Sequence, residues 1–156
     1  MNLKVSNYIN KLDSLFDLAK DIDNDEVKGH FAKYLCVRIS GLIEVYFKAQ
    51  IGDYVERSSP KEVANCVNKQ FNHFTNIRSD KIDELLKVFS SDWSDEFSSK
   101  MNEELSSSLN SIIGNRHLIA HGDSDNISMA NVSIYYDNVK KILNILDHII
   151  TKKRRR

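Results

Sequence analysis

The stretch from Met101 to Gly122, MNEELSSSLNSIIGNRHLIAHG, combines the pattern of a packed helix with polar groups that such a helix rarely carries. Its large apolar residues recur three or four positions apart, as on one face of an α-helix. They are Met101, Leu105, Leu109, Ile112 and Ile113. Glycine readily adopts the left-handed conformation that follows a last helical turn, so Gly122 predicts that the helix ends at His121.

Continuing the same helical phase places Arg116 under Ile112, on the side that faces the core. A guanidinium group cannot lose its charge in a protein, and burying it without a partner costs several kcal/mol. It must therefore meet a carboxylate, backbone carbonyls or the phosphate of a ligand. This requirement makes Arg116 the first candidate for a functional residue.

Two histidines follow on the same helix. His117 and His121 come after Ile113 at a spacing of four, so they share one face. His121 lies in the last turn, where the carbonyl ends of the helix favour the protonated imidazole. Arg116 and His121 are about 140° apart around an ideal helix, so they do not share a face. They would border one groove if the helix end tightens, or, more simply, if a second copy of the helix packs alongside.

The Arg-x4-His spacing, with a polar residue directly after the arginine and late in a helical hairpin, resembles the motif of the HEPN superfamily (higher eukaryotes and prokaryotes nucleotide-binding). The wider run from Leu109 to Gly122, with aromatic residues near Phe71 and at Tyr135 and Tyr136, resembles the RiboL-PSP-HEPN branch. The likeness extends from about Leu35 to the last helix. One departure is His117, because relatives often carry asparagine or aspartate directly after the arginine.

The resemblance implies a small helical bundle that dimerises and, in many members, acts as a metal-independent endoribonuclease. Such members are often toxins or parts of antiviral and abortive-infection systems, whereas others are inactive interaction modules. The implied partners are RNA, a second copy of the chain, and a cognate antitoxin or another defence-system protein. No cofactor and no metal are expected.

RNA supplies its own nucleophile, the 2′-hydroxyl, so its cleavage needs proton transfer and stabilisation of the charge that builds on the phosphate. Histidine can contribute a factor of about 10² to 10⁴ by proton transfer, and the planar fork of arginine matches two phosphate oxygens. Our hypothesis assigns proton transfer to His121 and the scissile phosphate to Arg116. Asn115 and His117 would hold the phosphate or orient the reacting groups, with Glu44 in support.

Three other interpretations remain open from the sequence. His117 and His121 have the spacing of two zinc ligands on a helix, with Asp123 as the only close third ligand. The domain could instead be a non-catalytic interaction or scaffold module. Finally, Arg116 could serve structure alone by pairing with Glu44, a residue that could also pair with Arg38.

The 156 residues predict one all-α domain, a bundle of about five to seven helices over residues 1–151, followed by a basic tail at 152–156. Without the tail, 17 basic residues stand against 22 acidic ones, so RNA would need a local positive site or the tail. No signal peptide or membrane span is predicted, and we expect no membrane partner and a cytoplasmic location. Cys36 and Cys66 are expected to be small core residues in a reducing compartment.

Hydrophobic periodicity and capping signals place the other helices. The expected segments are a first helix at about residues 3–22, a long helix at 26–50, a loop at 52–58, a helix opened by a capping box at 59–62, short helices from residue 80 and after residues 91–92, and a last helix at 131–151. Gly41 inside the long helix predicts a close approach by a neighbouring helix backbone. Trp93 and Phe97 could stack RNA bases, but their helical spacing favours core packing.

Overall fold

The computed structural model describes residues 1–123 and 127–152, which form seven helices and, within those ranges, no strand. The helices are α1 (Leu3–Ala19), α2 (Asp25–Ser58), α3 (Lys61–Phe71), α4 (Ser79–Phe89), α5 (Ser91–Lys100), α6 (Glu103–His121) and α7 (Met129–Thr151). The expected all-α class is therefore confirmed.

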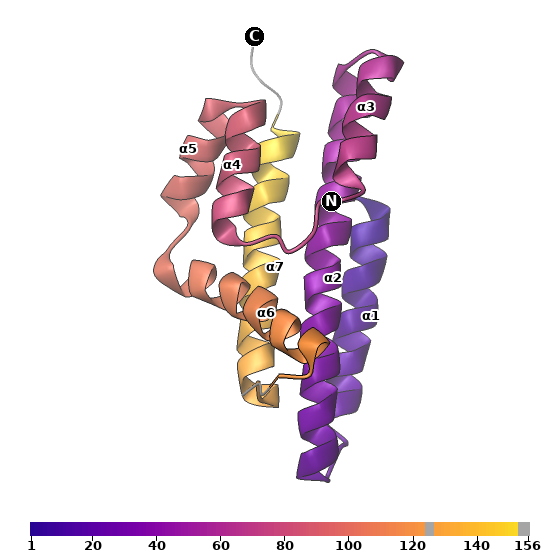
Figure 1. Cartoon of the computed structure of the whole chain (residues 1–156), viewed down its shortest axis with the longest axis vertical. Helices are drawn as coiled ribbons and strands as arrows, with labels where there is room; N and C mark the ends of the chain where they lie inside the picture. The colour runs from indigo at the N-terminus through magenta and orange to yellow at the C-terminus, as the bar shows by residue number, and fades with distance from the viewer. Residues whose placement is uncertain (124–126, 153–156) are drawn as a thin grey trace.

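The three helices α1, α2 and α7 lie along the long axis of the molecule (Figure 1). α3 packs on the C-terminal half of α2, while α4 and α5 form a pair that contacts α7 through α5. α6 crosses obliquely from α7 to α2, so that its last turn lies over α2 (Figure 1). This crossing brings the polar end of α6 against the middle of the longest helix, where Glu44 lies.

α2 continues to Ser58, so the prediction of a loop at residues 52–58 is wrong. Gly52 is buried, and a Cβ atom on it would come within 3.3 Å of the Asn68 side-chain oxygen on α3. The Tyr54 ring lies 4.9 Å from the ring of Trp93, measured between centroids. These contacts with α3 and α5 outweigh the helix penalty of glycine, which is about 1 kcal/mol. The capping-box signal also fails in detail, because α3 starts after Pro60 and has no side-chain cap.

Gly41 is tightly enclosed, but by a side chain and not by a helix backbone. A Cβ atom there would lie 2.8 Å from the hydroxyl oxygen of Tyr8. That hydroxyl donates to the Arg38 carbonyl at 3.0 Å and accepts from Arg38 Nε at 3.2 Å. Arg38 also donates to the Tyr34 hydroxyl at 2.7 Å, so its guanidinium faces tyrosines and not Glu44.

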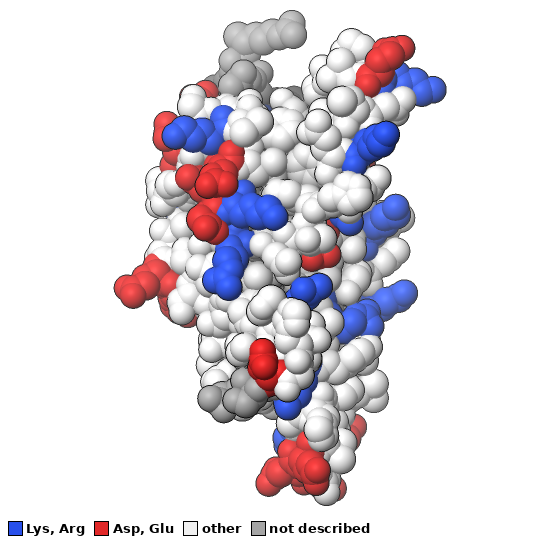
Figure 2. Space-filling model, viewed as in Figure 1, with Lys and Arg blue, Asp and Glu red and all other residues white. Residues whose placement is uncertain are grey.

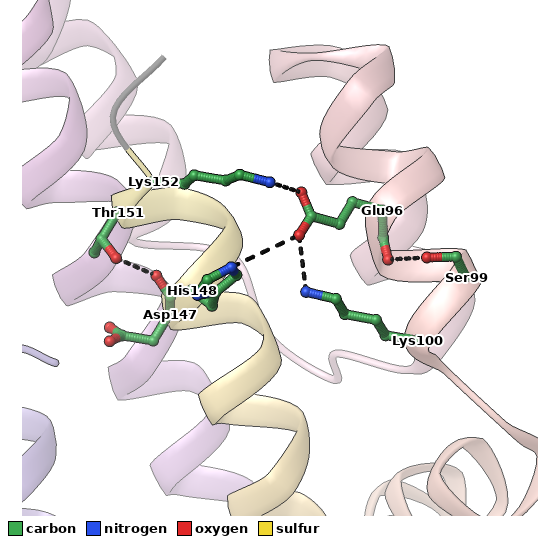
Figure 3. A network of polar contacts seen from close by, with 7 residues as sticks. All are labelled: Glu96, Ser99, Lys100, Asp147, His148, Thr151 and Lys152. Atoms are coloured by element: carbon green, nitrogen blue, oxygen red, sulfur yellow. Dashed lines mark hydrogen bonds and ion pairs between the residues drawn. The ribbon is translucent and has the colours of Figure 1, made fainter. Parts of the chain in front are cut away.

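The end of α7 is tied to α5 by a network of charges around Glu96 (Figure 3). Its carboxylate accepts from Lys100 at 2.8 Å and from Lys152 at 3.1 Å, and His148 Nε2 lies 4.0 Å away. The hydrogen bonds from Lys100 and then Lys152 hold the pKa of Glu96 below its ordinary value. Of the predicted basic tail, only Lys152 lies within the described residues.

The burial of the two cysteines differs. Cys36 is buried, as expected, whereas Cys66 is exposed, because the short helix α3 packs only one side on α2. Within residues 1–123 and 127–152, no helix has both the length and the apolarity that a bilayer crossing demands.

Candidate functional site at the end of α6

α6 ends at the predicted residue. Gly122 takes the left-handed conformation with φ of 74°, and its N–H donates to the Ile119 carbonyl at 3.3 Å. The next N–H, of Asp123, donates to the Leu118 carbonyl at 3.0 Å. Both hydrogen bonds are typical of a helix that a glycine terminates. They place His121 in the last turn, at the surface of the protein.

Arg116 is half-buried where α6 crosses α2. Its Nη1 donates to the side-chain oxygen of Asn76 at 3.2 Å, and the Asn76 backbone N–H donates to Glu44 Oε1 at 3.4 Å. The expected direct pairing of Glu44 with Arg116 or Arg38 is therefore replaced by a relay through Asn76. An amide oxygen carries no net charge, so this contact orients the guanidinium without neutralising it.

Asn76 is a candidate site residue that the sequence did not point to. It lies between α3 and α4 with φ of 53°, a left-handed conformation that asparagine adopts more readily than most other residues. The available signal was an asparagine in a chain break after an aromatic segment. Nothing in the local pattern indicated that this break would pass between α2 and α6.

The connection that carries Asn76 is fixed at several points. The Ser79 backbone N–H donates to the Asn110 side-chain oxygen at 3.1 Å, and Asn110 Nδ2 donates back to the Ser79 hydroxyl at 3.1 Å. Lys81 Nζ donates to the Thr75 carbonyl at 2.6 Å, and Ile77 is fully buried. Ser79 is thus tied to α6 and Thr75 to α4, and the two contacts hold Asn76 between them near Arg116.

Both histidines of the motif are exposed, and they share a face as predicted. The centroids of the His117 and His121 rings lie 4.4 Å apart, with the planes tilted by 58°. Asn115 is half-buried, and its Nδ2 donates to the Ser111 carbonyl of its own helix at 2.8 Å. Its amide is therefore turned back along α6.

Four of the five predicted site residues form two groups in the structure, and the fifth, Asn115, bonds to its own helix. Glu44 and Arg116 are joined through Asn76, whereas His117 and His121 lie side by side on the outer face of α6. Arg116 and His121 thus point to different sides of α6 within one chain, as their spacing predicts. Over the parts of the chain that are described, no group of three or more histidine, cysteine, aspartate or glutamate residues could hold a metal ion. The described residues therefore give the zinc interpretation no support.

On the face that Figure 2 shows, positively charged side chains are scattered among negatively charged ones. Lysine and arginine side chains are interspersed with aspartate and glutamate side chains over the helices seen there. Nucleic-acid binding through bulk charge needs a continuous basic surface. On this face, an RNA ligand would therefore have to be held by individual cations.

The structure is a helical bundle in which α6, which carries an arginine and, five residues later, a histidine, packs on the longest helix, as the resemblance to the HEPN superfamily implies. The model of the RiboL-PSP-HEPN family matches residues 4–152, so the chain belongs to that family. The match covers nearly the whole chain and confirms the resemblance seen in the sequence. HEPN domains often have ribonuclease activity. Searches of curated proteins and of solved structures each found no match.

Proposed function

We propose that this protein is a metal-independent endoribonuclease of the HEPN type, a cytoplasmic toxin or antiviral-defence effector that acts as a dimer. One observation carries the proposal. Arg116 is held at the rim of the α2–α6 crossing by a neutral amide, and within the described ranges no carboxylate forms an ion pair with it. Its charge and its other N–H donors remain available to a phosphate, and the same helix end carries two exposed imidazoles on its outer face.

The reaction needs no group beyond these side chains. A histidine accepts the proton of the RNA 2′-hydroxyl, and the oxygen attacks the adjacent phosphorus. The bond from phosphorus to the 5′-oxygen breaks, and that oxygen takes the proton from the protonated histidine, which leaves a 2′,3′-cyclic phosphate, a 5′-hydroxyl and a neutral imidazole. Arg116 stabilises the charge on the phosphate oxygens, and His121 transfers the proton. His117, beside His121, orients the phosphate or the reacting histidine.

A second copy of the chain would complete the site. Arg116 turns toward Asn76, whereas His121 lies on the outer face, so one copy does not aim both at one phosphate. In a symmetric dimer, the arginine of one protomer can face the histidine of its partner. Mixing Arg116→Ala with His121→Ala protein should then restore activity, because one site in each mixed dimer keeps both residues. A mixture as inactive as its components would show that the site does not combine residues from two copies.

The direct test is incubation of wild-type and Arg116→Ala protein with labelled total RNA in excess chelator, followed by analysis of the new ends. The proposal requires cleavage by the wild type only, with cyclic phosphate and 5′-hydroxyl ends. Purified His121→Ala protein that cuts RNA at the wild-type rate would remove His121 from the mechanism.

The second candidate is an inactive interaction module of a toxin–antitoxin or defence system. It is favoured by Asn115, whose amide is bound to its own helix, and by histidine at position 117, where relatives often carry asparagine or aspartate. Expression in a host separates the two candidates. Toxicity that is relieved by changing Arg116 or His121 supports the enzyme, whereas growth unaffected by the wild type supports the module.

A further inference from the structure

A second arginine, Arg78, lies close to α6. Its Nη2 atom is 4.0 Å from the point that a Cβ atom on Gly114 would occupy. Arg78 is exposed, and its guanidinium has no hydrogen-bond or ion-pair partner within residues 1–123 and 127–152. That distance is one of ordinary van der Waals contact, so the guanidinium lies beside this turn of α6.

The part of α6 that Arg78 approaches is the face that carries the histidines. Gly114 and His121 are seven residues apart, which amounts to about 20° of rotation and about 10 Å along the helix. His117 lies between them on the same side. The guanidinium of Arg78 and the two imidazoles therefore follow one another along one face of α6.

The same connection positions both arginines. Asn76, the partner of Arg116, is two residues before Arg78, a separation of at most about 7 Å along the backbone. Ser79, the residue after Arg78, is fastened to Asn110 on α6 by hydrogen bonds in both directions. Arg78 is therefore anchored at its backbone, while its side chain is free to meet a ligand.

Asp80, the carboxylate nearest to Arg78 in sequence, and two carboxylates near the ends of the Arg116 site make other contacts or lie elsewhere. Asp80 Oδ1 accepts the Lys81 backbone N–H at 2.9 Å, and Glu44 accepts the N–H of Asn76. Asp123 lies beyond the end of α6 and is exposed. No carboxylate of the described residues lies within 4.0 Å of the Arg78 guanidinium. Among the residues that the structure describes, no ion pair therefore neutralises the positive charge of Arg78.

We infer that Arg78 binds a phosphate that neighbours the scissile one, so the substrate is an RNA strand with at least two consecutive phosphates. The inference rests on the proposed ribonuclease function. A guanidinium binds phosphate oxygens through two parallel N–H donors, and at an exposed position this is expected to contribute about tenfold in affinity or in kcat/KM.

The test uses random-sequence oligonucleotides with a single ribose, so that each has one cleavable bond. In two further pools, the phosphate on the 5′ or the 3′ side of that bond is a neutral methylphosphonate. The wild type should cleave one of these two pools with a kcat/KM about tenfold lower than that for the fully charged pool. On the fully charged pool, kcat/KM of Arg78→Ala should be about tenfold below that of the wild type. On the methylphosphonate pool to which the wild type is sensitive, the two proteins should have the same kcat/KM. Arg57→Ala removes the same charge from the far end of α2 and should behave as the wild type.

Binding of a fully 2′-deoxy pool, measured in parallel, separates the inference from the proposed function. Cleavage by the wild type with Arg78→Ala equal to it on every pool would overturn the role of Arg78 and leave the ribonuclease proposal intact. Binding that depends on Arg78 without any cleavage of the ribose pools would support the phosphate contact and overturn the enzyme. If the wild type neither binds nor cleaves, both fail.

Discussion

Arg116 on α6 donates to the side-chain oxygen of Asn76 at 3.2 Å, across 40 residues of sequence. The amide oxygen orients the guanidinium of Arg116 but, being uncharged, does not neutralise it. A carboxylate in the same place would form an ion pair and compete with any phosphate for the guanidinium. The choice of asparagine therefore fits an arginine that is held ready for an anion.

Replacement of Arg116 by lysine should be nearly as harmful as replacement by alanine. An ammonium group cannot span two phosphate oxygens, so Arg116→Lys and Arg116→Ala should both lose about 10²- to 10³-fold in kcat. Rates are measured on labelled RNA in chelator, with circular dichroism as the check of folding. If the lysine variant keeps most of the activity, charge alone suffices and the fork is not needed.

Asn76→Gly should lower activity while leaving the fold intact. Glycine adopts φ of 53° without strain and retains the N–H that Glu44 accepts, but it removes the oxygen that orients Arg116. We expect a loss of about tenfold in kcat, comparable to one hydrogen bond to a charged group. The control is Asn72→Gly, at an exposed position after α3. Equal rates for the two variants would show that Asn76 does not orient Arg116.

Gly122→Ala should destabilise the protein by about 1 kcal/mol, because alanine is strained at φ of 74°. For a chain of this length, that corresponds to a fall in Tm of about 2 to 4 °C. For Gly29→Ala, the expected change in Tm has the opposite sign. Position 29 is helical, with nothing within 4 Å of an added Cβ, so alanine should raise Tm slightly. A Tm for Gly122→Ala at or above the wild-type value would contradict the expected strain.

The network of Glu96 predicts a loss of stability in acid. The pKa of Glu96 is held down in the folded protein by Lys100 and Lys152, so the unfolded chain takes up the proton first as the pH falls. The stabilisation is complete above the ordinary titration range of glutamate and disappears as the pH drops through the lowered pKa. Urea midpoints across this range should fall less for Glu96→Gln than for the wild type. Glu84→Gln, at an exposed position on α4, should follow the wild type.

Local signals were sufficient for the regular parts of the fold. Apolar spacing placed the core face of α6, since Leu105, Leu109 and Ile112 are all buried. Gly122 marked the last turn because its backbone freedom is a property of the residue itself. The same phase placed His117 and His121 on one face, and they lie there with their rings in contact distance.

The errors arose where distant segments compete with local preference. Gly52 indicated a loop, yet α3 packs against that stretch, the Tyr54 ring contacts Trp93 of α5, and α2 stays helical to Ser58. Glu44 was expected to meet an arginine directly, but a connection from elsewhere in the chain passes between them. Helix propensity amounts to about 1 kcal/mol for a glycine, which several buried contacts readily exceed.

By itself, the sequence determined that this protein is an all-α domain whose sixth helix ends with an arginine and two histidines, because helical periodicity and glycine conformations act over a few residues. Only the tertiary structure decided that Asn76 orients Arg116 and that Arg78 lies against Gly114. Such neighbours are brought together by the burial of apolar faces far apart in the chain, and no local pattern encodes which loop will cross which helix.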